Sequence, residues 1–301
     1  MNLDEEAAER SRSFTRAATR GRRGTARSDQ STLRSFIAVL ALISAPALAQ
    51  EWLGPPPPIP ATRIITLAPS ITETVLALDA KSSLIAVSRF CEFPEVEKLP
   101  RAGGFNDPSV ETIVALKPQV VVVQKGPGNQ KPVETLARLG ISVLALPLTS
   151  VDDVSLAMTE LGRVTGKTDR AKTLVDELAK ARADARATKV KTPKRVLFVY
   201  GFTPLVVAGP GSFSDQLLAD CGAANAAQKA PTAYPTFSLE SVARLAPDVI
   251  VDAADVKDGK AELEQLGPLK KAKWVTLPTK DLLHPGPALA KALPMLCPLV
   301  R

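Results

Sequence analysis

The chain has 301 residues, of which 45% are apolar and 4% aromatic, and its formal net charge is +7. This length and composition are sufficient for one or two ordinary globular cores. The basic residues are scattered and do not form runs interleaved with aromatic residues, which argues against a nucleic-acid partner.

The N-terminal part of the chain, residues 1–49, differs in composition from the rest. Residues 1–34 form a basic leader rich in Arg, Ser and Thr, with too few large apolar side chains to offset the entropy cost of ordering. The apolar run FIAVLALISAPALA follows, from Phe36 to Ala49. It is shorter than the ~20 residues that span a bilayer, so it predicts a signal peptide cleaved after Ala49. Residues 1–49 hold eight Arg and five Asp or Glu, so their removal lowers the formal charge from +7 to +4.

Four segments follow the expected cleavage site. Residues 50–62 form a proline-rich leader, which we expect to be stiff. Residues 63–152 alternate helical patterns with the strand-like stretches RIITLA, LIAVS, VVVV and ISVLALP. Residues 153–192 predict a helix that could break near Gly166. The alternation resumes over 193–301 with the strand-like stretches RVLFVYG, PDVIVDA and WVTLP, and a helix is expected after Pro287. The sequence therefore predicts two α/β lobes with parallel sheets, joined by a stiff helical connector that lets them move little.

A sequence pattern typical of a helix followed by a strand occurs twice, first as SVETIVALKPQVVVV (109–123) and again as SLESVARLAPDVIV (238–251). Each copy predicts a helix stopped by proline and a β-branched strand covered on both faces. We expect these helices to start at Asp107-Pro108 and Thr236-Phe237, where a capping oxygen precedes the helix. Four residue pairs coincide in register: Ser109 with Ser238, Glu111 with Glu240, Leu116 with Leu245, and Pro118 with Pro247.

Glu111 and Glu240 fall in the first turn of their predicted helices. The helix dipole stabilises an acid there, and this explains either residue alone. Their matched placement is explained better by a partner that contacts both.

The sequence carries few signs of catalysis. Its one histidine, His284, lies in the loop HPGPAL. The simplest interpretation is that the His284 side chain is partly exposed in this loop. The glycine loop of AGPGSFSDQLL (208–218) lacks dinucleotide and P-loop patterns and is better explained as a turn than as a phosphate site. A hydrolase using Ser214 or Ser70 is the alternative from another class, and it lacks a nucleophile elbow. We therefore predict a protein that is not an enzyme and has no catalytic, metal or cofactor site.

The chain contains three cysteines, and pairing is expected in an oxidising compartment. Cys221 and Cys297 both belong to the predicted second lobe, whereas Cys91 belongs to the first. We therefore expect a Cys221–Cys297 disulfide and a free Cys91.

From Arg63 to the C-terminus the sequence resembles the periplasmic metal-chelate-binding proteins of ABC importers, and among them the vitamin B12 binders. The resemblance rests on RIITLAPSITETVLAL, VETIVALKPQVVVV, LARLGISV, LADCGAAN and SLESVARLAPDVIV. It implies two Rossmann-like α/β lobes joined by a single long helix, with the ligand in the cleft between them. It also implies a monomeric periplasmic protein that delivers its ligand to membrane permease subunits, with Glu111 and Glu240 docking onto permease arginines.

The implied ligand is cobalamin, with haem or a ferric siderophore as the alternative. The B12 binders line their cleft with aromatic rings, against which a flat macrocycle buries area at small entropy cost. The candidate ligand-binding residues are Phe90, Phe105, Tyr200, Tyr234, Asp281 and His284.

Some residues depart from the pattern of the B12 binders and leave the ligand open. Phe105, Tyr234 and approximately Gln124 stand where those proteins carry tryptophan. Arg89 suits an anionic siderophore, and His284 or Tyr234 could serve as a ligand of haem iron.

Overall fold

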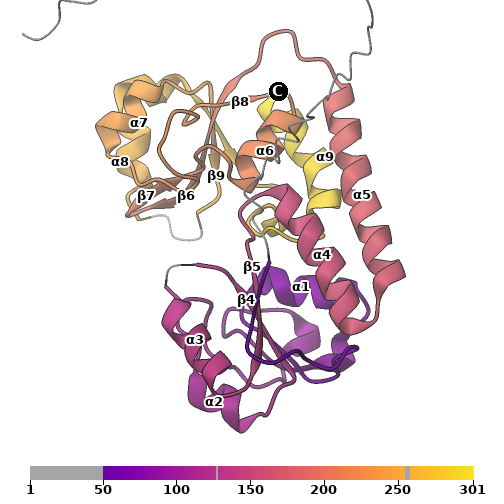
Figure 1. Cartoon of the computed structure of the whole chain (residues 1–301). Helices are drawn as coiled ribbons and strands as arrows, with labels where there is room; N and C mark the ends of the chain where they lie inside the picture. Colours follow the sequence, from indigo (N-terminus) through magenta and orange to yellow (C-terminus); the bar gives the residue numbers. More distant parts are fainter. Residues whose placement is uncertain (1–49, 127, 255–257) are drawn as a thin grey trace, which may run out of the picture. The chain divides into compact units, whose positions relative to one another are not determined.

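Two β-sheets with flanking helices organise the chain (Figure 1). The computed structural model describes residues 50–126, 128–254 and 258–301. The predicted basic leader and signal peptide, residues 1–49, lie outside the described residues. Within the described residues, no helix has both the length and the apolar character needed to cross a membrane.

The first lobe is built on a five-stranded sheet with the order β1-β5-β4-β2-β3. Strands β2 to β5 are parallel and coincide with the four predicted stretches, whereas β1 pairs antiparallel with β5. The sequence did not predict β1, because this short strand lies inside the proline-rich leader. The elements are β1 Glu51–Leu53, β2 Ile64–Thr66, α1 Pro69–Ala77, β3 Leu84–Val87, α2 Val110–Ala115, β4 Val120–Gln124, α3 Gln130–Arg138 and β5 Ser142–Leu146.

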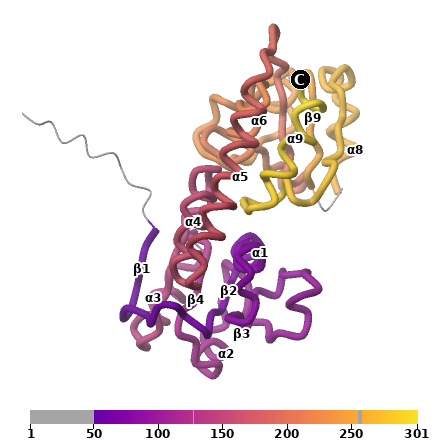
Figure 2. Tube along the Cα trace, turned by 90° about the vertical axis from the view of Figure 1, so that its right-hand side faces the viewer, coloured from indigo at the N-terminus to yellow at the C-terminus, as the bar shows by residue number. Residues whose placement is uncertain are grey.

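Two helices, α4 (Val151–Thr165) and α5 (Thr168–Ala187), connect the lobes. Gly166 ends α4 with a left-handed φ of 70°, at the place where the sequence indicated a break. The long helix α5 packs against α4 and also against α6 and α9 of the second lobe. Figures 1 and 2 both show α5 extending from the first lobe to the second.

The second lobe contains a sheet with the path β10-β9-β6-β7, and β8 pairs with β6. Strands β6, β9 and β10 are parallel and coincide with predicted stretches, whereas the sequence did not predict the short β7 and β8. The elements are β6 Arg195–Phe202, β7 Leu205–Val207, α6 Phe213–Asp220, β8 Ala224–Asn225, α7 Leu239–Leu245, β9 Val249–Asp252, α8 Lys260–Gln265, β10 Lys273–Thr276 and α9 Leu289–Val300.

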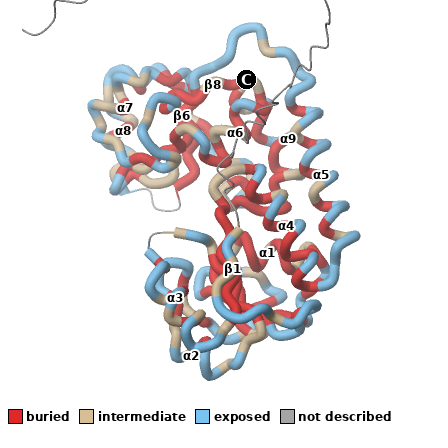
Figure 3. Tube along the Cα trace, viewed as in Figure 1, coloured by how far each residue is buried: buried red, intermediate tan, exposed pale blue. Residues whose placement is uncertain are grey.

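Both faces of each sheet are covered, which explains the β-branched runs without alternation. In β4, Val120 and Val122 face the cluster that holds α1 and α4, whereas Val121 and Val123 face α2 and α3. The first of these clusters continues through α5, α6 and α9 to the inner face of the second sheet. Figure 3 shows the buried residues of α4 and α5 on their inner sides. One continuous core therefore spans both lobes, which supports the prediction that they move little.

The helical part of the repeated pattern forms α2 in the first lobe and α7 in the second. The predicted start sites are wrong, because the N-caps are Ser109 and Ser238, whose hydroxyls accept hydrogen bonds from the Thr112 and Ser241 backbone N–H. The serine oxygens satisfy first-turn donors directly, so both helices begin later than the sequence predicted. The recurring serine is thus explained by capping.

The two repeated helices also end alike. Lys117 and Ala246, the residues before the repeated prolines, both have left-handed φ values, of 47° and 45°. Arg63 donates to the carbonyl oxygen of Leu116 at 2.6 Å, and Arg195 donates to that of Leu245 at 2.7 Å. Arginines at the first parallel strand of each lobe therefore bond the last carbonyls of α2 and α7 in the same way.

The predicted disulfide between Cys221 and Cys297 is present, and Cys91 is free and buried. The bond joins the end of α6 to α9, across a sequence separation of 76 residues. Closing a loop of this length restricts the unfolded chain and contributes about 4 kcal/mol in the chain-entropy estimate.

We expect thiol titration of the denatured, unreduced protein to find one reactive thiol, that of Cys91. Replacement of both Cys221 and Cys297 by serine should lower the free energy of unfolding by about 4 kcal/mol in urea titrations. Three reactive thiols in the unreduced protein would show that the bond does not form.

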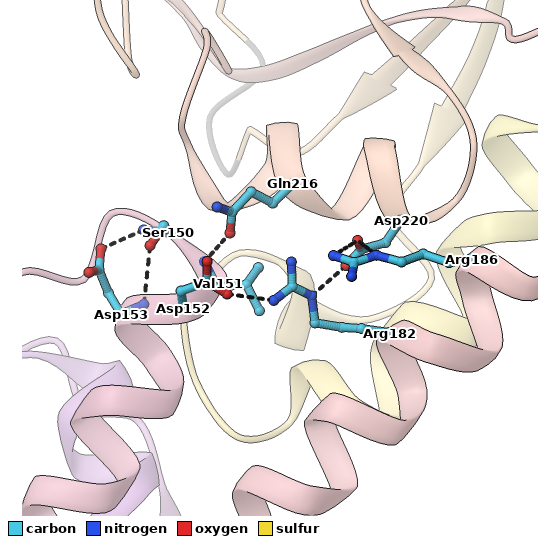
Figure 4. Close-up of polar contacts among 8 residues, drawn as sticks. All are labelled: Ser150, Val151, Asp152, Asp153, Arg182, Arg186, Gln216 and Asp220. Carbon is cyan, nitrogen blue, oxygen red and sulfur yellow. Dashed lines mark hydrogen bonds and ion pairs between the residues drawn. The ribbon is translucent and has the colours of Figure 1, made fainter. Parts of the chain in front are cut away.

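A polar network fastens α6 to the two connecting helices (Figure 4). The Asp220 carboxylate, 1% exposed, accepts hydrogen bonds from Arg182 at 2.6 Å and from Arg186 at 2.5 Å. Arg182 also bonds Asp152 at 2.7 Å, and Gln216 accepts from the first backbone N–H of α4 at 2.6 Å. The start of α4 and the end of α5 are thereby held to the same helix of the second lobe.

Asp220→Ala should lower the free energy of unfolding by about 3 kcal/mol, because it leaves arginines without their buried partner. Asp184→Ala is the matched control, since Asp184 bonds Lys180 on the exposed side of the same helix α5. That variant should change the free energy by no more than about 0.5 kcal/mol. Equal effects of the two substitutions in urea titrations would refute the role of Asp220.

Candidate functional site

A cleft of about 720 Å³ is lined by residues of both lobes. All six predicted ligand-binding residues line it, although they lie far apart in the sequence. Phe90 and Phe105 come from loops of the first lobe, Tyr200 from β6 and Tyr234 from the loop before α7. The structure thus brings the six residues together, and their role in binding remains a prediction.

The aromatic side chains of the cleft differ in exposure. Phe90 is 50% exposed, Phe105 36% and Tyr234 40%, whereas Phe213, which the sequence analysis did not select, is buried. Tyr200 contacts Tyr234 with ring centroids 5.7 Å apart and Phe213 with centroids 6.2 Å apart. Large apolar side chains left exposed in a concave surface are typical of a binding site.

The phenols of the cleft are held in their neutral form. Burial raises the pKa of Tyr200 well above its usual value, nearby Tyr234 adds to this, and the hydrogen bond with Ser214 partly opposes it. Desolvation of its hydroxyl group also raises the pKa of Tyr234, although the residue as a whole is 40% exposed, and a hydrogen bond with the Phe213 backbone opposes the rise. Both groups therefore present O–H rather than phenolate at neutral pH.

Arg89, proposed from the sequence as a binder of anionic chelates, has a partner. Its guanidinium forms an ion pair with Asp107 and lies over the Phe90 ring at 5.0 Å from the centroid. The pair is about half exposed, with side-chain exposures of 46% and 58%. An incoming anion would therefore compete with a carboxylate that already holds this arginine.

Glu73 is a cleft residue that the sequence analysis missed. It lies on α1, and its Oε1 accepts a hydrogen bond from the Ala288 backbone N–H, 2.9 Å away in the second lobe. Burial raises its pKa from 4.5 to about 7, with the Ala288 bond opposing and the charge of Asp281 adding to the rise. The sequence offered no signal for this role, because the partial burial of Glu73 and its contact with the opposite end of the chain appear only in the fold.

The repeated acids lie outside the cleft lining. Glu111 and Glu240 are exposed residues in the first turns of α2 and α7. The pKa of Glu240 is lowered by its own backbone N–H, by Ser238 and by the charge of Arg244. Figure 1 shows α2 and α7 at the outer parts of the two lobes, both away from α5.

The family profile described as periplasmic binding protein matches residues 64–267. Among curated relatives, the vitamin B12-binding protein of Photorhabdus laumondii is 27% identical over 237 residues, which cover 78% of this chain and 86% of the relative. The vitamin B12-binding protein of Salmonella typhi is 28% identical over 239 residues, which cover 79% of this chain and 89% of the relative.

Solved structures with the same fold include two with different ligands in their names. The periplasmic heme-binding protein RhuT from Roseiflexus sp. RS-1 has a TM-score of 0.66 and 26% identity, covering 80% of this chain and 98% of the other. The periplasmic vitamin B12 binding protein BtuF of Vibrio cholerae has a TM-score of 0.68 and 22% identity, covering 81% and 98%. Since the family profile covers more than half of the sequence, the chain belongs to the periplasmic binding protein family.

Proposed function

We propose that this protein captures cobalamin in the cleft between its lobes and delivers it to the permease of an ABC importer. The observation that carries the proposal is the set of aromatic side chains from both lobes that converge on one cleft. Phe90 and Tyr234 are exposed there, so a flat macrocycle would bury apolar area of both without ordering flexible side chains. The curated relatives named vitamin B12-binding proteins support the same ligand.

Cleft chemistry supports cobalamin over an anionic siderophore. Arg89 is paired with Asp107, which weakens the case for an anionic siderophore. The remaining charged side chains of the cleft are the acids Glu73, Glu92 and Asp281 and the base Lys280. This lining suits a ligand without net negative charge, such as an amide-fringed corrin.

Haem is the second candidate, because a heme-binding protein is among the solved relatives and His284 lines the cleft. Under either ligand the protein acts as a carrier. We infer that it catalyses no reaction, since Ser214 and Ser70, the nucleophiles considered from the sequence, are both buried, and Ser214 is hydrogen-bonded to Tyr200. We also infer that the mature protein begins at Gln50 and works in the periplasm as a monomer.

The test of the ligand is retention after desalting. Protein incubated separately with cyanocobalamin, haemin and a ferric siderophore should keep the absorbance of cyanocobalamin alone. Retention of haemin or of the siderophore in its place would overturn the cobalamin assignment.

The double variant Phe90→Ala/Tyr234→Ala should weaken cyanocobalamin binding by roughly 2–6 kcal/mol, at ~1–3 for each buried ring. Leu139→Ala is the control, because Leu139 is an exposed apolar residue outside the cleft lining. It should leave the affinity unchanged. Unchanged affinity of the double variant would place the site elsewhere.

We further propose that Glu111 and Glu240 dock onto arginines of the permease. Charge-assisted carboxylate–arginine pairs set orientation and encounter rate across an interface. Both acids are exposed and lie on short helices with matching caps, one helix in each lobe. A permease with two symmetric subunits would contact the two helices in equivalent ways.

Replacing both docking acids by alanine should abolish uptake in cells while leaving thermal stability and cyanocobalamin affinity nearly unchanged, because neither side chain is buried. Replacement by lysine should be at least as severe, since like charges would meet at the interface. Glu262→Ala is the control, as Glu262 is an exposed first-turn acid of α8. If uptake survives in the double lysine variant, the two acids do not dock and only interact favourably with their helix dipoles.

A further inference from the structure

Glu73 connects the two lobes at the cleft. The side chain starts from α1 of the first lobe, and its carboxyl reaches the segment of the second lobe that leads into α9. Oε1 accepts from the Ala288 N–H, a donor at the start of α9 that has no partner within the helix. The carboxyl therefore satisfies a helix end on the opposite side of the cleft.

The carboxyl also packs directly against the backbone at Gly286. A Cβ atom at Gly286 would lie 2.5 Å from Oε2 of Glu73 and 2.9 Å from its carboxyl carbon. Such a distance is shorter than real Cβ contacts, so the glycine allows the backbone to approach the carboxyl. Two contacts thus hold this segment, one by hydrogen bonding and one by packing.

The segment held by Glu73 carries cleft-lining residues. Lys280, Asp281, Leu283, His284 and Pro285 all line the cleft and shortly precede the contact with Glu73. A shift of Ala288 and Gly286 would move this part of the lining toward or away from the aromatic rings. The titratable groups that share the cleft with Glu73 are Lys280, Asp281 and His284 on this segment, Arg89 and Glu92 of the first lobe, and Tyr200 and Tyr234 of the second.

We propose that Glu73 is a positioning residue, whose carboxyl fixes the segment 280–288 against the first lobe and makes this contact depend on protonation. The proposal rests on the proposed function for the identity of the ligand, whereas the contact itself belongs to the ligand-free protein. Protonated Glu73 accepts from Ala288 without burying a charge, whereas ionisation strengthens this one bond and costs more in desolvation. Ionised Glu73 places a second negative charge near Asp281 and requires a desolvated charge in the cleft.

The direction of the pH effect follows from proton linkage. The pKa of Glu73 is about 7 in the folded protein and near 4.5 in the unfolded chain. Between these values the folded state holds a proton that the unfolded state has lost, so rising pH lowers stability. The contribution of Glu73 is complete below about pH 4.5 and is lost as the pH rises through about 7.

The first experiment compares urea unfolding of the ligand-free protein and its Glu73→Gln variant at pH 5 and pH 8. Glutamine keeps the acceptor for Ala288 and cannot ionise, so Glu73→Gln should be the more stable protein at pH 8, and its advantage should shrink at pH 5. Glu95→Gln, at an exposed glutamate of the first lobe, is the control and should show no pH-dependent difference from the wild type. A wild-type-to-Glu73→Gln difference that is the same at both pH values would overturn the proposal.

The second experiment measures positioning through cyanocobalamin affinity. Glu73→Ala should weaken binding at least tenfold, and Gly286→Ala, whose Cβ would displace the Glu73 carboxyl, should weaken it less. Glu73→Gln should stay within about threefold of the wild type at pH 6. In the double variant Glu73→Ala/Gly286→Ala the clash is absent, so binding should be no weaker than in Glu73→Ala alone. Strictly additive losses would overturn the proposed contact. Failure of the wild type to bind cyanocobalamin would refute the proposed ligand only, because the pH experiment decides the role of Glu73 without it.

Discussion

Burial of both faces of two mainly parallel sheets is the constraint on which the rest of the structure depends. Neither sheet is amphipathic, since adjacent valines of β4 point into different apolar clusters. Each sheet therefore requires helices on both sides. On their inner sides the two sheets share these helices, and α4, α5, α6 and α9 form one cluster with both. The cleft lies between lobes that cannot separate without exposing part of this core.

Such a core makes the cleft largely preformed. Asp220 and its two arginines fasten α6 to α5, and the disulfide fastens the end of α6 to α9. Helix α9 begins at the residues that Glu73 contacts. The elements that shape the cleft are therefore cross-linked to each other, which limits the ordering entropy that a ligand must offset.

The two copies of the repeat share the contacts that hold their helix as well as the exposed glutamate on it. In both copies a serine caps the helix, a left-handed residue ends it, and an arginine at the first parallel strand of the lobe bonds its last carbonyl. Gln119 and Asp248, also in register, accept from the backbone N–H of Arg63 and of Arg195. These bonds orient α2 and α7 identically against their own sheets. Two exposed glutamates on such helices present equivalent carboxylates, which two dispersed acids on unrelated loops would not do.

The sequence predicted those parts of the fold that depend on local sequence patterns. Runs of β-branched residues predicted the central parallel strands, and a glycine predicted the break at Gly166. The placement of the cysteines in the two lobes predicted which two are bridged and which one is free. Strands β1, β7 and β8 are too short to show a period. The helix starts were misplaced because Asp107-Pro108 and Thr236-Phe237 offered competing capping signals. The aromatic cleft residues came from the family resemblance, which aligns residues distant in sequence. Glu73 lies inside one of the stretches that carried the resemblance, yet its contact is with a segment near the opposite end of the chain.

The cleft combines exposed rings with titratable groups that carry little positive charge. Arg89 is paired with Asp107, Tyr200 and Tyr234 are neutral phenols, and Glu73 is only partly ionised near neutral pH. A strongly anionic chelate entering such a site would lose hydration while the arginine of the first lobe stays engaged by its carboxylate, and desolvating an uncompensated charge is costly. A macrocycle with amide groups at its edge loses far less, because amides can exchange water for the neutral donors and acceptors of the cleft. Desolvation, more than any countercharge, sets the pKa of the Glu73 carboxyl, so this cleft group changes its charge near neutral pH.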